Sequence, residues 1–150
     1  MDIVEFFDSE EKERLLQVLE QCPWSAGKFL ARNIQNGTIE ENLGPNSKIF
    51  FLMNKEKEVM AFLTLTQKDC IEDPKLFPWI GFVYTSENFR GNRYSQVLIK
   101  HAISVAKAEG FHKVYLATDH VGLYEKYGFV YMENRMDVWN EDSRIYYIQC

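Results

Sequence analysis

A basic stretch without carboxylates lies within an otherwise acidic sequence. The segment from Phe89 to Gly110 reads FRGNRYSQVLIKHAISVAKAEG, and it contains no Asp or Glu between Asn88 and Ala108. The same window contains Arg90, Arg93, Lys100 and Lys107, although the whole chain has a formal net charge of -5. Positive charge concentrated in this way would suit the binding of an anion.

The pattern of this stretch predicts a strand, a tight turn at Gly91-Asn92 and then a helix. Leu98, Ala102 and Val105 recur at helical spacing and predict one buried face. Free backbone N–H groups and the positive end of the helix dipole occur where a helix begins, so this arrangement can form a phosphate cradle. The alternative is that Arg90 and Arg93 are solvated or paired with acids elsewhere. The nucleotide patterns GxxxxGK[ST] and GxGxxG are absent.

Two motifs resemble those of the GCN5-related N-acetyltransferase (GNAT) family. Arg90–Ser95 (RGNRYS) resembles the family signature [Q/R]-x-x-G-x-[G/A], with Arg93 where Gly is usual and Ser95 where Gly or Ala is usual. Leu123–Phe129 (LYEKYGF) resembles the family's short fourth helix and the strand after it. The resemblance is detailed over Trp79–Phe129 and topological over the rest.

The resemblance implies a binding site for acetyl-CoA as cosubstrate. The turn would hold the pyrophosphate through backbone N–H groups, and Arg93 in place of Gly is expected to alter that turn. The preceding strand would hydrogen-bond the pantetheine arm, and the strand Lys113–Thr118 would splay away from it to admit the thioester. The implied coenzyme-binding residues are Val83, Tyr84, Thr85, Arg90, Gly91, Asn92, Arg93, Tyr94, Ser95 and Gln96.

The implied reaction is direct transfer of the acetyl group to an amine in a ternary complex. Tyr124 matches the family's tyrosine general acid, and the alternative for it is a packing role. An aliphatic amine is mostly protonated at pH 7, so a base is also needed. The base stays open among Glu87, Asp69, Glu72, Asp73, Asp119 and His120. Asp119 could instead be the N-cap of the helix that carries Tyr124, and His120 could share a face of that helix.

The acceptor is not defined by the sequence. Trp24, Phe77 and Trp79 could line an acceptor pocket, with Glu72 and Asp73 attracting a cation, although packing is the alternative for these aromatic residues. Small amines, aminoglycosides, amino acids and a protein N-terminus or lysine all stay open. One alternative function is an acetyl-CoA-binding regulatory or interaction module without turnover. Another is a small anion-binding domain unrelated to coenzyme A.

The segments around these motifs predict an α/β fold with a mixed, mostly antiparallel sheet of six to seven strands and about four helices. Apolar and β-branched runs predict strands, and helical periodicity predicts helices. The predicted strands are Ile3–Phe7, Lys48–Met53, Val59–Gln67, Trp79–Thr85, Lys113–Thr118, Phe129–Met136 and Arg144–Cys150. The predicted helices are Ser9–Cys22, Ser25–Asn36, one from Tyr94 to about Ala108, and a short one that ends at Gly128.

Composition sets the broad class. A length of 150 residues with 46% hydrophobic content predicts one domain over residues 1–150. The acidic balance argues against nucleic acid or an anionic membrane as partner. The spacing of Cys22, Cys70 and Cys150 is not that of a metal site, so no metal is expected. The sequence shows no secretory signal pattern, so a cytoplasmic location is expected. Late strands such as Arg144–Cys150 could pair in a homodimer or complete the sheet.

Overall fold

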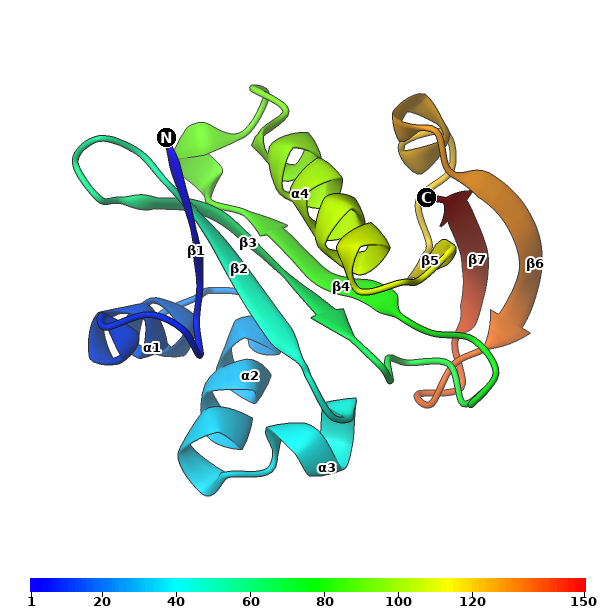
Figure 1. Cartoon of the computed structure of the whole chain (residues 1–150), viewed down its shortest axis with the longest axis horizontal. Helices are drawn as coiled ribbons and strands as arrows, with labels where there is room; N and C mark the ends of the chain where they lie inside the picture. Colours follow the sequence, from blue (N-terminus) through cyan, green and yellow to red (C-terminus); the bar gives the residue numbers. More distant parts are fainter.

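The computed structural model describes all 150 residues of the chain (Figure 1). Seven strands, four α-helices and two short 3₁₀ helices follow one another in an order close to the predicted one. In chain order they are β1 (Asp2–Glu5), α1 (Lys12–Glu20), α2 (Ser25–Asn36), α3 (Ile39–Leu43), β2 (Lys48–Met53), β3 (Val59–Thr66), β4 (Trp79–Thr85), η1 (Glu87–Phe89), α4 (Tyr94–Ala108), β5 (Lys113–Thr118), η2 (Tyr124–Tyr127), β6 (Val130–Met136) and β7 (Asp142–Gln149).

All seven strands belong to one sheet, in the order β1-β2-β3-β4-β5-β7-β6. Only β4 and β5 are parallel neighbours, and every other pair is antiparallel. The helix α4 connects the two parallel strands, as a crossover between parallel strands requires. The predicted mixed, mostly antiparallel sheet is confirmed.

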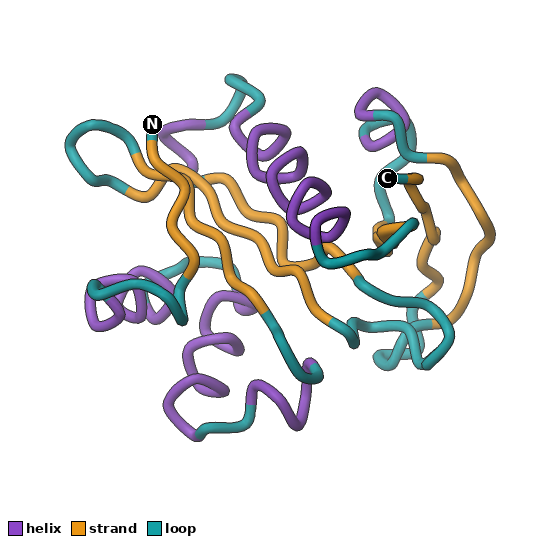
Figure 2. The backbone as a smooth tube through the Cα atoms, viewed as in Figure 1, coloured by secondary structure: helices purple, strands orange, loops and turns teal.

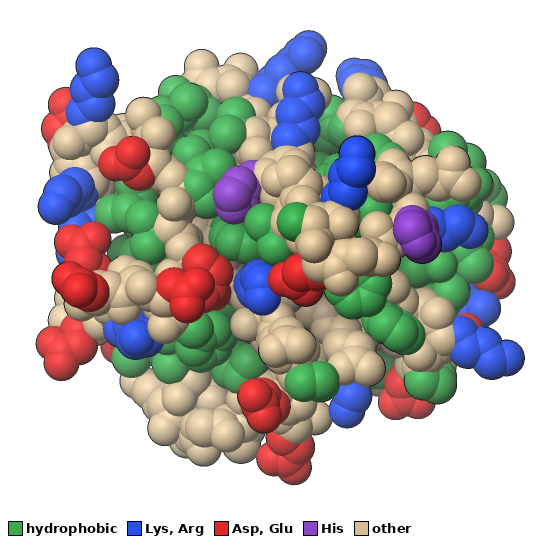
Figure 3. Space-filling view, in the orientation of Figure 1, with side chains coloured by type: hydrophobic (Ala, Val, Ile, Leu, Met, Phe, Trp, Pro, Cys, Tyr) green, Lys and Arg blue, Asp and Glu red, His purple; other side chains and the backbone are tan.

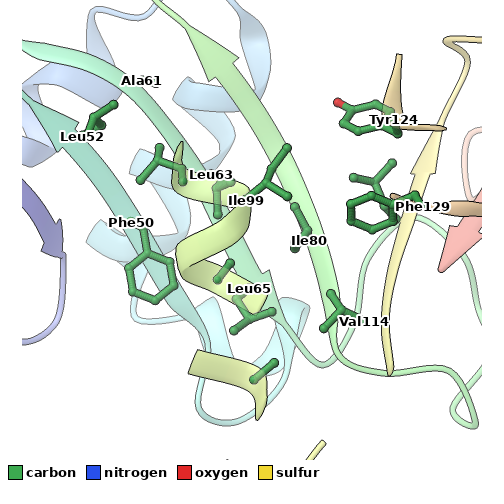
Figure 4. Packing of buried hydrophobic residues seen from close by; sticks show 14 of the residues in the cluster. Phe50, Leu52, Ala61, Leu63, Leu65, Ile80, Ile99, Val114, Tyr124 and Phe129 are labelled. Atoms are coloured by element: carbon green, nitrogen blue, oxygen red, sulfur yellow. The ribbon is translucent and has the colours of Figure 1, made fainter. Parts of the chain in front are cut away.

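Helices cover both faces of the sheet. Figures 1 and 2 show α4 on one face and α1, α2 and α3 gathered on the other. Alternate residues of β2 explain this arrangement, because successive side chains of a strand point to opposite faces. Phe50 and Leu52 are buried with α4 (Figure 4), whereas Ile49 and Phe51 are buried with the N-terminal helices. The two faces of the sheet therefore have separate hydrophobic cores, with a smaller third cluster around Trp79.

Some predicted boundaries were wrong. The first helix begins at Lys12 instead of Ser9, because the Ser9 hydroxyl accepts the Glu11 amide at 2.9 Å in a turn that precedes the helix. The helices α3 and η1 were not predicted, since segments of five and three residues are too short to show periodicity. The strands β1, β3, β6 and β7 differ from their predictions by one or two residues at one or both ends, and α1 ends two residues before the predicted Cys22. No helix combines the length and apolar composition that crossing a bilayer requires.

Candidate active site

A gap opens in the middle of the sheet where β4 and β5 separate. The two strands pair only at Trp79 with Tyr115 and at Ile80 with Leu116. Beyond Ile80, Phe82 has a φ of 49°, and the register of β4 against β3 shifts between Phe62 and Thr64. A bulge of this kind bends a strand and increases its twist. The predicted splaying of these strands is confirmed.

The edge of β4 that faces the gap offers unpaired main-chain groups. The Ser86 amide donates to the Met60 carbonyl at 2.9 Å, so Ser86 faces β3. Because main-chain groups alternate sides along a strand, those of Thr85 face the gap. The Thr85 carbonyl accepts Nε of Arg90 at 3.1 Å. The pairing of Val83 with an extended, peptide-like ligand, as in an added strand, stays a prediction.

The turn before α4 has the properties of an anion cradle. The first turn of the helix contains no acidic residue, and its amides lack partners inside the helix. The amides of Gly91, Asn92 and Arg93 donate to no acceptor in the protein. Gly91 has a φ of 87° with open space around it, and the Asn92 side chain braces the turn by donating to the Phe89 carbonyl at 3.2 Å. Consecutive free amides at a helix N-terminus fit a pyrophosphate.

The two arginines of the turn differ in what they contact. Arg93 is exposed and is the N-cap of α4, with φ 59° and ψ 32°. Arg93 adopts the left-handed conformation at a cost of about 1–2 kcal/mol, and the expectation that it alters the turn stays a prediction. Arg90 is turned back onto β4, with its guanidinium 5.9 Å from the Tyr84 ring. Figure 3 shows Lys and Arg side chains along the upper edge, where α4 begins in Figure 1.

Tyr124 lies beside the gap on the side of β5. It is 7% exposed and contacts Tyr127 and Phe129 edge to face, each with ring centroids 6.1 Å apart. In Figure 4 its ring lies over the space where the strands diverge, with the oxygen on the β4 side. Burial, with smaller contributions from Tyr127 and Asp119, raises the pKa of Tyr124 to about 12. The phenol therefore keeps its proton at neutral pH and can donate it.

The base candidates lie in different places. Glu87 is exposed in η1, next to the cradle. It is six residues after Gly81, which corresponds to a chain length of up to about 20 Å from the point where β4 and β5 part. The predicted N-cap role of Asp119 and the shared helix face of His120 were wrong, because η2 begins only at Tyr124 and its N-cap is Leu123. Both residues are exposed in the preceding loop. Asp69, in contrast, contacts Gly81 at the junction of β4 and β5.

Of three predicted acceptor residues, one is buried in the core, one is paired with an arginine and one is exposed without a partner. Trp79 is 1% exposed and its indole N–H donates to the Leu76 carbonyl at 2.7 Å, so its predicted place in an acceptor pocket was wrong. Asp73 accepts Nη1 of Arg135 at 2.7 Å, which holds the pKa of its carboxyl below the usual value and neutralises its charge. Glu72 is exposed and has no ion-pair partner.

Trp24, another predicted acceptor residue, packs against aromatic side chains of β4. It is 40% exposed and stacks on Tyr84, with centroids 6.0 Å apart and planes at 15°, and its centroid is 6.4 Å from that of Phe82. The ring of Phe29, in α2, stacks on that of Phe82 with centroids 5.7 Å apart. A cavity of about 190 Å³ beside them is lined by residues that include Cys22, Phe62 and Tyr84. An aromatic wall thus covers the bulge on the face of α1–α3.

The aromatic wall and the residues around Gly81 were not predicted as parts of the site. Phe29 and Phe82 are 53 positions apart, so nothing local connects them. A signal did exist at Gly81, since a lone Gly within an apolar strand indicates a bulge or a close approach. No group of three or more His, Cys, Asp or Glu side chains is placed to hold a metal ion.

Solved structures of acetyltransferases share this fold. The spermidine N-acetyltransferase of Vibrio cholerae, in complex with CoA and spermine, is 16% identical with a TM-score of 0.65, over 98% of this chain and 95% of that one. A proposed streptothricin acetyltransferase of Bacillus anthracis, in complex with acetyl-CoA, is 20% identical with a TM-score of 0.58. That match covers 71% of this chain and 64% of the other. Among curated proteins, none matches significantly.

The parted parallel strands and the turn after β4 thus occur in a fold that acetyltransferases share. The model of the acetyltransferase (GNAT) family matches residues 6–129, which include the gap, the cradle and Tyr124. The chain belongs to the acetyltransferase (GNAT) family, whose members are N-acetyltransferases that use acetyl-CoA.

Proposed function

We propose that this protein transfers the acetyl group of acetyl-CoA directly to a primary amine in a ternary complex. The observation that carries the proposal is the gap between β4 and β5, which has the amide cradle at one end and Tyr124 beside it. An extended coenzyme could contact both in one binding mode. Acetyl-CoA supplies the activated acyl group.

The residues of the gap have distinct parts in binding. The amides of residues 91–95 hold the pyrophosphate, and the first turn of α4 supplies those of Tyr94 and Ser95. The Gln96 amide already donates to the Arg93 carbonyl at 3.1 Å, so Gln96 can contribute only its side chain. Arg93 adds charge from the exposed side of the turn. Arg90 acts mainly by fixing the Thr85 carbonyl and thereby the edge of β4. The main chain of Val83 pairs with the pantetheine arm.

Tyr124 serves as the proton donor to the thiolate that leaves. Its raised pKa favours the protonated phenol in the free protein, and a donor placed at the leaving group typically contributes about 10²–10⁴ in rate. The hydroxyl on the β4 side of the ring (Figure 4) is the geometric support for this role.

Polyamines are the first acceptors to test. The Vibrio cholerae structure of similar fold holds spermine with CoA, and a protonated polyamine suits an aromatic wall such as Trp24, Phe29 and Phe82. Aminoglycosides, amino acids and peptide amines complete the panel, because fold and cosubstrate do not select among them.

Release of free thiol from acetyl-CoA with this panel tests the proposal. We expect turnover with at least one amine, and a loss of about 100-fold in kcat for Tyr124→Phe at unchanged coenzyme affinity. Tyr127→Phe is the matched control, because it removes the hydroxyl of the neighbouring ring and should keep turnover. Full activity of Tyr124→Phe would reject its acid role. Saturable acetyl-CoA binding without turnover for every amine would support the non-catalytic binding module.

A further inference from the structure

The carboxyl of Asp69 is fitted against the backbone of β4. Asp69 follows β3 in the loop that leads to β4. A Cβ added to Gly81 would lie 2.2 Å from its Oδ1 and 3.1 Å from its Cγ. Any side chain at position 81 would therefore displace the carboxyl. Gly81 provides the room that this carboxyl needs.

A second polar group reaches the same place. The same Cβ would lie 3.2 Å from Oγ1 of Thr64, which pairs with Gly81 across β3 and β4. Oγ1 of Thr64 is the only buried side-chain polar atom without a hydrogen-bond partner. Because buried hydroxyls are almost always bonded, the unused hydroxyl indicates a position for another polar group. The Thr64 side chain lies on the same face of the sheet as Phe62, two residues earlier in β3, which is the face with the aromatic wall.

This place is the inner end of the gap. Gly81 directly follows Ile80, the last β4 residue that pairs with β5. The cradle lies at the outer end, beyond Thr85. A ligand whose pyrophosphate is in the cradle and whose arm follows the edge of β4 past Val83 ends beside Gly81. The acyl group would then be within reach of the Asp69 carboxyl.

The surroundings of Asp69 suit a proton acceptor. Burial raises the pKa of Asp69 to about 6, against an opposing contribution from the Cys70 amide and thiol. Asp137, from the loop after β6, is the other charged group near Cys70, and no Lys or Arg pairs with Asp69. An unpaired carboxylate that is more basic than usual accepts a proton better than one such as Asp73, which Arg135 neutralises.

We propose that Asp69 is the general base of the acetyl transfer, with Gly81 as its positioning residue because it leaves room for the carboxyl; this inference rests on the proposed function. The carboxylate takes one proton from the ammonium form of the acceptor, and the neutral nitrogen attacks the acyl carbon. The C–N bond forms and the C–S bond breaks, and Tyr124 protonates the thiolate. The new amide nitrogen loses its second proton, which returns to the phenolate through water. Asp69 then releases its proton to solvent.

The test compares Asp69→Asn with the unchanged protein across pH. We expect kcat to fall by about 100-fold or more, while the dissociation constant of acetyl-CoA changes less than about threefold. In the unchanged protein, kcat/KM should fall on the acid side with an apparent pKa near 6. In Asp69→Asn that acid limb should disappear. The rate should recover as the pH approaches the pKa of the acceptor amine, because the amine is then neutral without a base.

Asp142→Asn is the control, because it makes the same change at an exposed carboxyl of β7. Asp69→Glu adds a variant that keeps the charge and should recover part of the lost rate. An unchanged kcat and acid limb in Asp69→Asn would overturn the assignment while leaving the acetyltransferase proposal intact. Absence of turnover in the unchanged protein with every amine would instead reject the proposed function itself. If Asp69→Asn does not fold, an acid limb in the unchanged protein well away from pH 6 would also overturn the assignment.

Discussion

The two ends of β4 have opposite chemistry. The outer end, at Arg90–Ser95, is exposed and basic, and main-chain amides supply its binding groups. The inner end, at Gly81, is enclosed by an acidic side chain, an unbonded hydroxyl and aromatic rings. The outer end suits a charged group that is bound and not changed. The inner end suits a step in which protons move.

The difference shows how binding and reaction can be separated along one strand. Amides of a turn are fixed by the backbone, so they hold an anion without titrating near neutral pH. A carboxyl out of water has a pKa that its surroundings shift, so it can accept a proton there. Changes at the outer end should therefore affect affinity, and changes at the inner end should affect turnover.

Gly81→Ala should have the largest effect and should break the inner end alone. The new Cβ would occupy the place of the Asp69 carboxyl, 2.2 Å from Oδ1. We expect turnover to fall by about 100-fold, with a loss of about 1–3 kcal/mol in the free energy of unfolding from overpacking. Thiol release and urea unfolding measure the two effects.

Gly110→Ala is the control for Gly81→Ala, since Gly110 follows α4 with open space around it and a φ of 94°. It imposes backbone strain without touching the gap, and it should keep turnover. Unchanged turnover in Gly81→Ala would show that the reaction tolerates a displaced Asp69 carboxyl. That result would contradict the assignment of the proton-transfer step to the inner end of β4.

Arg93→Glu should break the outer end. A negative charge at the start of α4 repels the pyrophosphate, so acetyl-CoA affinity should fall about tenfold, or about 1.4 kcal/mol. The remaining affinity should depend less on salt. Calorimetric titration at two salt concentrations measures both effects. Lys107→Glu makes the same charge change in the last turn of the helix, and an equal loss there would mean that only net charge matters.

Arg93→Gly sharpens the comparison, because it separates conformation from charge. Glycine removes the cost of the left-handed backbone, so the free energy of unfolding should rise by about 1 kcal/mol. Acetyl-CoA affinity should fall, but less than in Arg93→Glu. Urea unfolding gives the first quantity. A decrease in stability would show that the Arg93 side chain makes contacts that outweigh its strain.

Arg135→Met should have the smallest effect on turnover and stability. It compares Asp73, which Arg135 pairs with, and Asp69, which is unpaired in the same loop. The ion pair lowers the pKa of Asp73, so its contribution to stability is present above the unfolded value of 3.8 and is lost as the pH falls through the lower folded value. The variant should be slightly less stable at pH 7, and the difference should vanish in acid. Turnover should not change. A loss of turnover would connect Asp73 to the site.

The outer end of β4 was predictable from the sequence, and the inner end was not. The cradle lies within one local segment, so the turn, the helix and the missing acids are read from consecutive residues. The inner end brings together Asp69, Thr64, Gly81 and Phe29 from four elements, and only the sheet register and the packing of α2 make them neighbours. Nothing in the sequence distinguished Asp69 from the other base candidates.

Local conformation also set a limit on prediction. Only glycine adopts left-handed backbone freely, so a side chain at position 93 disfavours that conformation, yet the surrounding turn holds Arg93 in it. Trp79 was expected in a pocket because its loop is aromatic, yet Ile71, Leu76 and Tyr115 bury it. Strand boundaries were predicted to within one or two residues because alternation and β-branched runs are local signals.

A calorimetric titration of the purified protein with acetyl-CoA tests the central claim that β4 and the start of α4 form one coenzyme site. Desulfo-CoA and ATP serve as comparison ligands, since the first keeps the arm and the pyrophosphate and the second keeps only the nucleotide phosphates. We expect saturable binding of acetyl-CoA and desulfo-CoA, and none of ATP. An absence of binding by both coenzyme forms, or equal binding of ATP, would contradict that claim.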